Sequence, residues 1–243
     1  MARFFVDAHQ MNSDTIVLTG ENAQHAKVLR LKAGEQVLVC DGEGMECVCT
    51  VDSLSSGEVN LTVMKRRVSS SEAKVSVSIY MGFPKSDKLE HVIQKATELG
   101  ANEIIAFPAA RSVSRPDAKS LEKKVERWQK IAASAAEQSG RGKIPHILVL
   151  DSYTAALQRA AKADKALMFY ENEHATTLRM ALESGSFQSV SMITGPEGGL
   201  EEKEVQQALE AGLQVCTLGS RILRCETAPL CALSAVMYAA GEF

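Results

Sequence analysis

The sequence has 243 residues, enough for one or two domains, and its 45% hydrophobic and 23% charged residues are typical of a globular protein. This composition excludes wholesale disorder, and the longest stretch without a charge, residues 227–241, is too short to span a bilayer. The net charge of −3 is unevenly distributed, because residues 71–150 carry 13 basic and 9 acidic side chains. That basic stretch is either a nucleic-acid footprint or simply a solvated helix face.

The first 70 residues show mostly strand patterns. Strands are expected at 36–41, 46–51 and 59–63, with a turn at 41–44 and one short helix at 22–29. This pattern predicts a small β-barrel. Cys47 and Cys49 share one strand face and are expected to be buried as small hydrophobic side chains. The polar, basic and serine-rich residues 65–71 are expected to form a linker.

From residue 74 onward, strands and helices alternate. Such alternation indicates a parallel sheet that helices cover on both faces, and we expect this second domain to comprise residues 74–243. Its strands are expected at 75–81, 104–107, 147–150, 166–170, 190–194 and 215–218. Its helices are expected at 86–99, 121–138, 154–163, 176–182, 201–211 and 227–240.

The six cysteines and the N-terminus bear on the compartment. The cysteines form no CxxC pair and have no metal-ligand spacing, so we expect reduced thiols and no bound metal. The N-terminal residues lack the apolar stretch of a signal peptide. Together these features favour a cytoplasmic protein that makes no membrane contact.

Three strand ends in the last 75 residues have unusual compositions. In open parallel sheets the ligand binds at the carboxyl ends of the strands. These ends are residues 168–171, the glycine-rich 193–200, and 217–228. The glycine-rich segment lacks the lysine of a phosphate-binding loop, and its acidic character suits a cationic or neutral ligand. An ordinary strand-to-helix turn is the alternative interpretation.

Arg221 and Arg224 lie in the last of these segments, directly before an uncharged helix. Two arginines at a strand end can hold a phosphate or a polarised carbonyl group. The alternative is a structural network in which they pair with Glu226 or Glu197. The histidines are scattered and no nucleophile has a base beside it in sequence, so hydrolase and metalloenzyme functions are disfavoured.

The second and third strand ends together resemble the signature of the SPOUT methyltransferases. Residues 195–200 read Gly-Pro-Glu-Gly-Gly-Leu, and residues 218–228 read Leu-Gly-Ser-Arg-Ile-Leu-Arg-Cys-Glu-Thr-Ala. The resemblance is strongest to the SPOUT enzymes that form N3-methyluridine in 16S ribosomal RNA, and it covers nearly the whole chain. Residues 88–100, 111–112 and 136–141 are similar to further motifs of these enzymes, and residues 25–44 are similar to their PUA-like RNA-binding barrel.

The resemblance implies an α/β fold: a PUA-like barrel over residues 1–70, then a SPOUT domain over 74–243 with a deep trefoil knot. It implies S-adenosylmethionine as cofactor, 16S ribosomal RNA within the small subunit as partner, and a homodimer. The implied catalytic residues are Arg221, Arg224 and Glu226, with Glu226 orienting an arginine. The implied cofactor-binding residues are Tyr170, Glu171, Thr194, Gly195, Pro196, Glu197, Gly198, Gly199, Leu218, Gly219, Ser220, Ile222, Leu223, Arg224 and Thr227. The implied RNA-binding residues are Arg3, Arg30, Lys88, Arg111 and Arg141.

One position departs from the family pattern, because Cys225 stands where a threonine is expected. The lost hydroxyl costs about one hydrogen bond, or about 0.5–1.5 kcal/mol. Two other functions stay open at this point. One is a SPOUT enzyme that methylates a ribose O2′ or a tRNA base. The other is a non-catalytic RNA-binding protein with a degenerate α/β domain, against which the intact glycine-rich segment argues.

Overall fold

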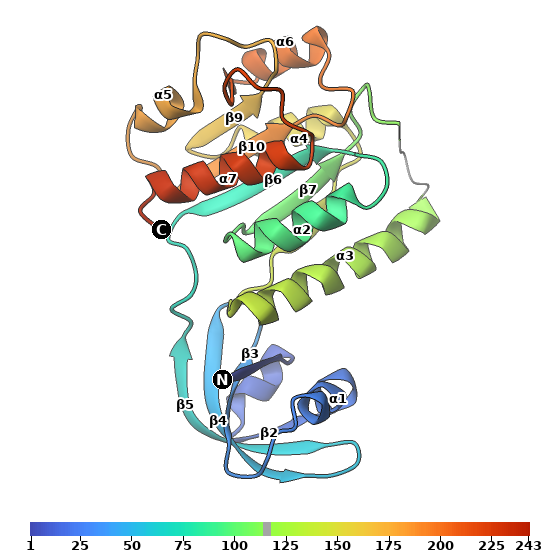
Figure 1. Ribbon diagram of the computed structural model, residues 1–243, viewed down its shortest axis with the longest axis vertical. Coiled ribbons are helices and arrows are strands. Elements are labelled where there is room, and N and C mark those ends of the chain that lie inside the picture. Colours follow the sequence, from blue (N-terminus) through green and yellow to red (C-terminus); the bar gives the residue numbers. More distant parts are fainter. Residues whose placement is uncertain (114–117) are drawn as a thin grey trace. The chain divides into compact units, whose positions relative to one another are not determined.

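The computed structural model describes residues 1–113 and 118–243, and the chain forms two compact units (Figure 1). The first unit comprises residues 1–72 together with 136–144, and the second comprises 73–135 together with 145–243. Within the described ranges, no helix combines the length and the apolar character needed to cross a membrane.

The first unit contains a five-stranded sheet of order β1-β3-β4-β5-β2, in which only the β1–β3 pair is parallel. Its core contains Phe4, Val37 and Val39, and it includes Cys47 and Cys49, whose predicted burial is confirmed. The elements are β1 (Ala2–Phe5), η1 (Ala8–Asn12), β2 (Thr15–Leu18), α1 (Gly20–Val28), β3 (Gln36–Cys40), β4 (Met45–Leu54) and β5 (Val59–Val68).

The linker expected at 65–71 is wrong for its first half, because β5 continues to Val68. Lys65 pairs in register with Val48, and Arg67 pairs with Glu46. Glu46 is only 2% exposed, and its carboxylate accepts a hydrogen bond from Arg67 at 2.6 Å. The sequence alone suggests that the charge of Arg67 is solvated. In the structure Arg67 instead pairs with a buried glutamate on the neighbouring strand.

The second unit contains a six-stranded parallel sheet of order β11-β9-β10-β6-β7-β8, as predicted. The strands are β6 (Ser76–Gly82), β7 (Glu103–Phe107), β8 (His146–Val149), β9 (Lys165–Phe169), β10 (Ser189–Thr194) and β11 (Gln214–Cys216). The helices are α2 (Lys88–Glu98), α3 (Ala118–Ser139), α4 (Tyr153–Ala160), α5 (Leu178–Glu183), α6 (Glu202–Glu210) and α7 (Thr227–Ala239); the last residues of α3 belong to the first unit.

Helices cover both faces of this sheet. One core cluster joins Tyr80 and Ile193 of the sheet to Ala156 of α4 and Val205 of α6. Side chains of the opposite pleat, such as Met192, are fully buried as well, and α7 packs against β10, β6 and α2 (Figure 1). The strand order sets the carboxyl ends of β9, β10 and β11 side by side and is consistent with the knotted topology that the resemblance implies.

Candidate functional site

A cavity of about 450 Å³ opens at the carboxyl ends of β9, β10 and β11. This size falls within the range of small-molecule sites, about 300–1,000 Å³. Three chain segments form most of its wall: residues 169–171, 194–200 and 217–225. We call residues 195–199 the Gly-rich loop and residues 217–226 the C-terminal loop.

The residues predicted to bind the cofactor meet around this cavity. All of them except Thr227 line it, and Arg221 lines it too. Thr227 instead begins α7, where its backbone N–H donates to the carbonyl oxygen of Arg224 at 2.9 Å. The sequence analysis did not assign six further lining residues to any site: Phe169, His174, Leu200, Thr217, Cys225 and Ala228. Most of them are neighbours in sequence of residues that were predicted to bind the cofactor. This proximity is the signal by which the sequence could have identified them.

The Gly-rich loop is a tight turn that side chains would disrupt. A Cβ atom on Gly195 would lie 2.9 Å from the backbone carbonyl carbon of Gly199. Gly199 itself has a φ of +70°, and its N–H donates to the carbonyl oxygen of Pro196 at 2.9 Å. Glu171 lies so close that a Cβ on Gly199 would meet its Oε1 at 2.5 Å. The loop therefore presents mainly backbone atoms to the cavity.

Two sets of contacts hold the Gly-rich loop in place. The side chains of Glu201 and Glu204 form a capping box at the start of α6. Arg111 donates from Nη1 to the carbonyl oxygen of Gly198 at 2.9 Å and lies 3.8 Å from a carboxylate oxygen of Glu201. In this structure Arg111, predicted to bind RNA, therefore braces the Gly-rich loop.

Lys88 was also predicted to contact RNA, and its side chain lines the cavity. Its Nζ is 3.0 Å from Oε1 of Glu197 and 3.4 Å from Oε2 of Glu226. Burial raises the pKa of both carboxyls, but hydrogen bonds outweigh burial, so both pKa values lie below the usual value. The hydrogen bond with Glu197 raises the pKa of Lys88. All three groups are therefore charged at neutral pH.

The expectation that Glu226 orients an arginine is not what the structure shows, because Glu226 pairs with Lys88 and accepts a hydrogen bond from the Cys225 thiol at 3.3 Å. Burial raises the pKa of that thiol to about 12, so it stays protonated and can donate. The guanidinium groups of Arg221 and Arg224 are exposed and pair with no residue of the described chain. The alternative interpretation was that these arginines pair with Glu226 or Glu197. In the structure, Lys88 is the residue that pairs with both carboxylates.

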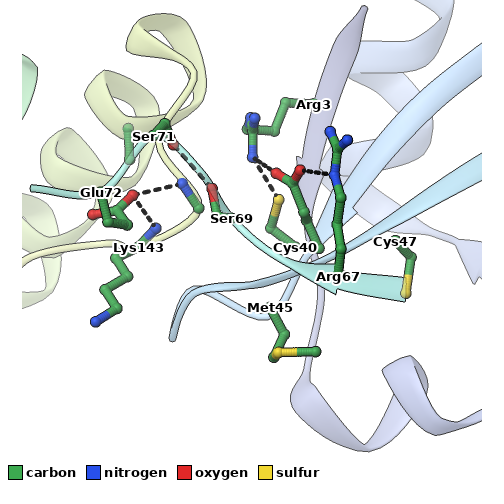
Figure 2. Close-up of polar contacts among 12 residues, drawn as sticks. Arg3, Cys40, Met45, Cys47, Arg67, Ser69, Ser71, Glu72 and Lys143 are labelled. Atoms are coloured by element: carbon green, nitrogen blue, oxygen red, sulfur yellow. Dashed lines mark hydrogen bonds and ion pairs between the residues drawn. The ribbon is translucent and has the colours of Figure 1, made fainter. Parts of the chain in front are cut away.

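The three RNA candidates of the first unit have different environments. Arg3 donates from Nη1 to Glu46 at 3.0 Å and to the Cys40 sulfur at 2.8 Å, as Figure 2 shows for Cys40. Arg141 has a side chain only 5% exposed and donates to Glu72 at 2.8 Å. Both guanidinium groups are paired with carboxylates inside the first unit, so they are not available to contact RNA. Arg30 is exposed, and its guanidinium has no partner among the described residues.

Glu72 collects further donors beside Arg141. The backbone N–H groups of Gly142 and Lys143 donate to its Oε1 at 2.8 and 3.1 Å (Figure 2). Residues 136–144 are thereby fixed within the first unit. As for metals, no group of three or more His, Cys, Asp or Glu residues in the described ranges could hold an ion.

Comparisons with known proteins agree with this architecture. Residues 71–237 match the family described as RNA methyltransferase domain, and residues 18–64 match the family described as RNA methyltransferase PUA domain. Ribosomal RNA small subunit methyltransferase E of Bacillus subtilis (strain 168) is 41% identical to this chain, and the match covers 98% of the chain and 96% of the relative.

Two similar proteins have solved structures that contain bound S-adenosylmethionine. One is a ribosomal RNA small subunit methyltransferase E from Neisseria gonorrhoeae bound to S-adenosyl methionine, with 30% identity, a TM-score of 0.87, and coverage of 98% of this chain and 97% of that one. The other is a methyltransferase from Legionella pneumophila in complex with the same cofactor, with 26% identity, a TM-score of 0.85 and the same coverage. With a family model spanning most of the sequence and a full-length relative at 41% identity, the chain belongs to the ribosomal RNA small subunit methyltransferase E family.

Proposed function

We propose that this protein transfers a methyl group from S-adenosylmethionine to N3 of a uridine in 16S ribosomal RNA of the small ribosomal subunit. The observation that carries the proposal is the cavity of about 450 Å³ at the three strand ends, enclosed by the two loops that bear the family signature. The names of the relatives supply the substrate class, a ribosomal RNA of the small subunit.

The residues at the cavity fit S-adenosylmethionine. The Gly-rich loop lets a ligand approach the backbone closely, and backbone N–H and C=O groups suit the polar edges of an adenine and an amino acid. Glu171 adds negative charge to the wall, which favours a ligand that carries a sulfonium cation. Phe169 and Leu200 add apolar surface for the ring system.

The bound cofactor supplies an activated methyl group. This chain has to hold the two reactants in line, which is worth several kcal/mol, and to stabilise the negative charge that forms on the uracil ring. Arg221 and Arg224 are suited to the second task, because both are permanently charged, line the cavity and have no partner in the described part of the chain. Glu197 and Glu226 have lowered pKa values and are therefore weak bases, so anion stabilisation is the better-supported contribution.

We assign RNA docking to the first unit and to the exposed Arg30, and we propose that the protein works as a cytoplasmic homodimer. Support for the dimer comes from α7. This uncharged helix buries Pro229, Leu233 and Val236 but leaves Tyr238 74% exposed and Cys231 exposed in the single chain. A second copy of the chain is the partner that would cover such a face.

The direct test is mass mapping of 16S ribosomal RNA. RNA from a strain lacking the gene should carry one unmodified uridine, and purified protein with S-adenosylmethionine should restore the methyl group on isolated small subunits. Fragment masses then locate the methyl group on the base or on the ribose. A methyl group on a ribose O2′, or on tRNA only, would overturn the proposal.

A further inference from the structure

We propose that Lys88 is a positioning residue of the cofactor site, which holds the Gly-rich loop and the C-terminal loop together through Glu197 and Glu226. The inference rests on the proposed function only in taking S-adenosylmethionine as the ligand. It replaces the expectation that Lys88 contacts RNA, and it assigns the Nζ atom a definite task within the protein.

The contacts of Lys88 join three segments that are far apart in sequence. Its Nζ lies 3.0 Å from Glu197 in the Gly-rich loop and 3.4 Å from Glu226 in the C-terminal loop. It also lies 3.7 Å from the sulfur of Cys225, whose thiol donates to Glu226. The side chain of Lys88 is 27% exposed and lines the cavity, so one ammonium group closes a network across the cavity wall.

The position of Lys88 is itself fixed by the backbone. Lys88 is the first residue of α2, and the connection before it lies close against the Gly-rich loop. The N–H of Lys85 donates to the same oxygen of Glu197 at 2.9 Å. Close approach also depends on Gly82 at the end of β6, where a Cβ atom would lie 2.7 Å from Cδ of Pro196. The lysine therefore reaches the two carboxylates from a rigid base.

The charges explain why the network needs a cation. Glu197 and Glu226 are both ionised at neutral pH and lie on either side of one ammonium group. Without that group, two like charges face each other across the junction of the loops and repel. Arg221 and Arg224 do not replace it, because neither makes an ion pair with these carboxylates in the described structure. Removing Lys88 should thus separate the loops that enclose the ligand.

The consequence is specific to cofactor binding. Lys88→Met keeps most of the apolar stem of the side chain, out to the Cε position, but removes the charged Nζ atom. We expect the dissociation constant and the KM for S-adenosylmethionine to rise about five- to tenfold, the size expected of two partly exposed ion pairs. The KM for small ribosomal subunits should stay within about twofold, and kcat should change less than the KM for the cofactor.

Calorimetric titration with S-adenosylmethionine and steady-state kinetics on small subunits test this directly. Lys88→Arg should recover at least half of the lost affinity, because a guanidinium can also bridge two carboxylates. The double variant Lys88→Met with Glu226→Gln should bind the cofactor no worse than Lys88→Met alone, because the two groups act through one contact. Lys95→Met is the matched control, because Lys95 also lies on α2 but pairs with Glu98, away from the cavity.

Two results would overturn the inference: a folded Lys88→Met protein that binds S-adenosylmethionine as tightly as the unmodified protein, or one whose KM rises for small subunits and not for the cofactor. The melting temperature of each variant shows whether it is folded. Lack of cofactor binding by the unmodified protein would instead reject the proposed function, so the two failures are distinguishable.

Discussion

Arg3 and Arg141 each donate to a nearly buried carboxylate, whereas Arg221 and Arg224 donate to no described residue. Removal of an arginine that is paired in the interior leaves a buried charge without a partner, which destabilises the fold. An arginine left unpaired at a cavity has its full hydrogen-bonding capacity for a ligand. Such partnering, which a sequence does not display, distinguishes the arginines that pair within the fold from those that remain available to a ligand.

The unpaired arginines lead to a prediction about turnover. If one of them stabilises the uracil anion, Arg221→Ala or Arg224→Ala should lower the single-turnover rate on small subunits about a hundredfold. Affinity for S-adenosylmethionine should barely change, since a cation gains nothing from a sulfonium. Raising the pH should partly rescue the affected variant, because more of the uracil is then already ionised.

Arg179→Ala is the matched control for this experiment, since Arg179 is exposed in the same unit but pairs with Glu183 on its own helix. It should leave the rate unchanged. Full turnover by both folded cavity variants would remove the anion-stabilising role from both arginines.

Glu46 leads to a prediction about stability and pH. Burial raises its pKa, but the hydrogen bonds from Arg67 and Arg3 outweigh burial and lower the net pKa. The stabilisation is therefore fully present above the unfolded-state pKa near 4.5 and is lost as pH falls through the folded-state value. Glu46→Ala should lower the free energy of unfolding at pH 7 by about 3 kcal/mol, because it leaves the guanidinium groups of Arg3 and Arg67 without their carboxylate partner.

Urea unfolding at pH 7 and pH 4 measures this effect. The gap between the unmodified protein and Glu46→Ala should narrow at pH 4. Asp52→Asn, an exposed position on the same strand, should change stability by less than about 0.5 kcal/mol at both pH values. A constant gap across pH would show that the charge of Glu46 does not contribute.

At the level of elements, the Gly-rich loop is the most constrained part of the site. Gly195→Ala would place a methyl group 2.9 Å from the backbone of Gly199, so the loop itself has to move. We expect cofactor affinity to fall at least about tenfold, because the ligand needs that backbone in place. Gly57→Ala is the control, since open space surrounds that position. Calorimetry that shows equal affinities for Gly195→Ala and the unmodified protein would exclude this loop from the binding site.

The exposed side of α7 predicts a dimer. Light scattering at micromolar concentration should give twice the chain mass, and Tyr238→Glu should shift the mass toward the monomer by placing a charge in a covered apolar face. Lys203→Glu, an exposed change on α6, should leave the mass unchanged. A monomeric mass for the unmodified protein would contradict the proposed homodimer.

For the whole molecule, RNA docking has to overcome an overall net charge of −3. Attraction must therefore come from local cations such as Arg30, and assembled small subunits should be preferred over naked RNA fragments. Arg30→Ala should weaken binding to small subunits and reduce the slope of log affinity against log salt by about one unit. Filter binding across a salt series measures the slope. If Arg30→Ala leaves both affinity and slope unchanged, docking does not involve this residue.

The sequence was sufficient to predict the parallel sheet and the place of the cavity. Valine- and isoleucine-rich strands that alternate with helices leave few other folds, and a parallel sheet binds its ligands at the carboxyl ends of its strands. The glycine-rich motif lies at one of those ends. The residues that line the cavity could therefore be predicted from their positions directly after the strands. The short strands β1 and β2 were missed.

What the sequence could not predict was which charges neutralise one another. Lys88 meets Glu197 and Glu226 from more than a hundred residues away, and Arg141 meets Glu72 across 69 residues. Both cations look like surface charges in their local sequence. Their partners are set by which strand ends and loops the fold brings together, and that information is not local.

The contribution of residues 136–144 to the first unit has a consequence for synthesis. The carboxylate of Glu72 takes donors from Arg141, Gly142 and Lys143, which leave the ribosome some seventy residues after it. The first unit therefore cannot complete its packing when its own strands have emerged, but waits until residues 73–135, about two fifths of the second unit, have been translated. A gene fragment that stops at residue 72 would encode a first unit that lacks residues 136–144. Dissecting this enzyme into independently expressed modules will require joining that segment to residues 1–72.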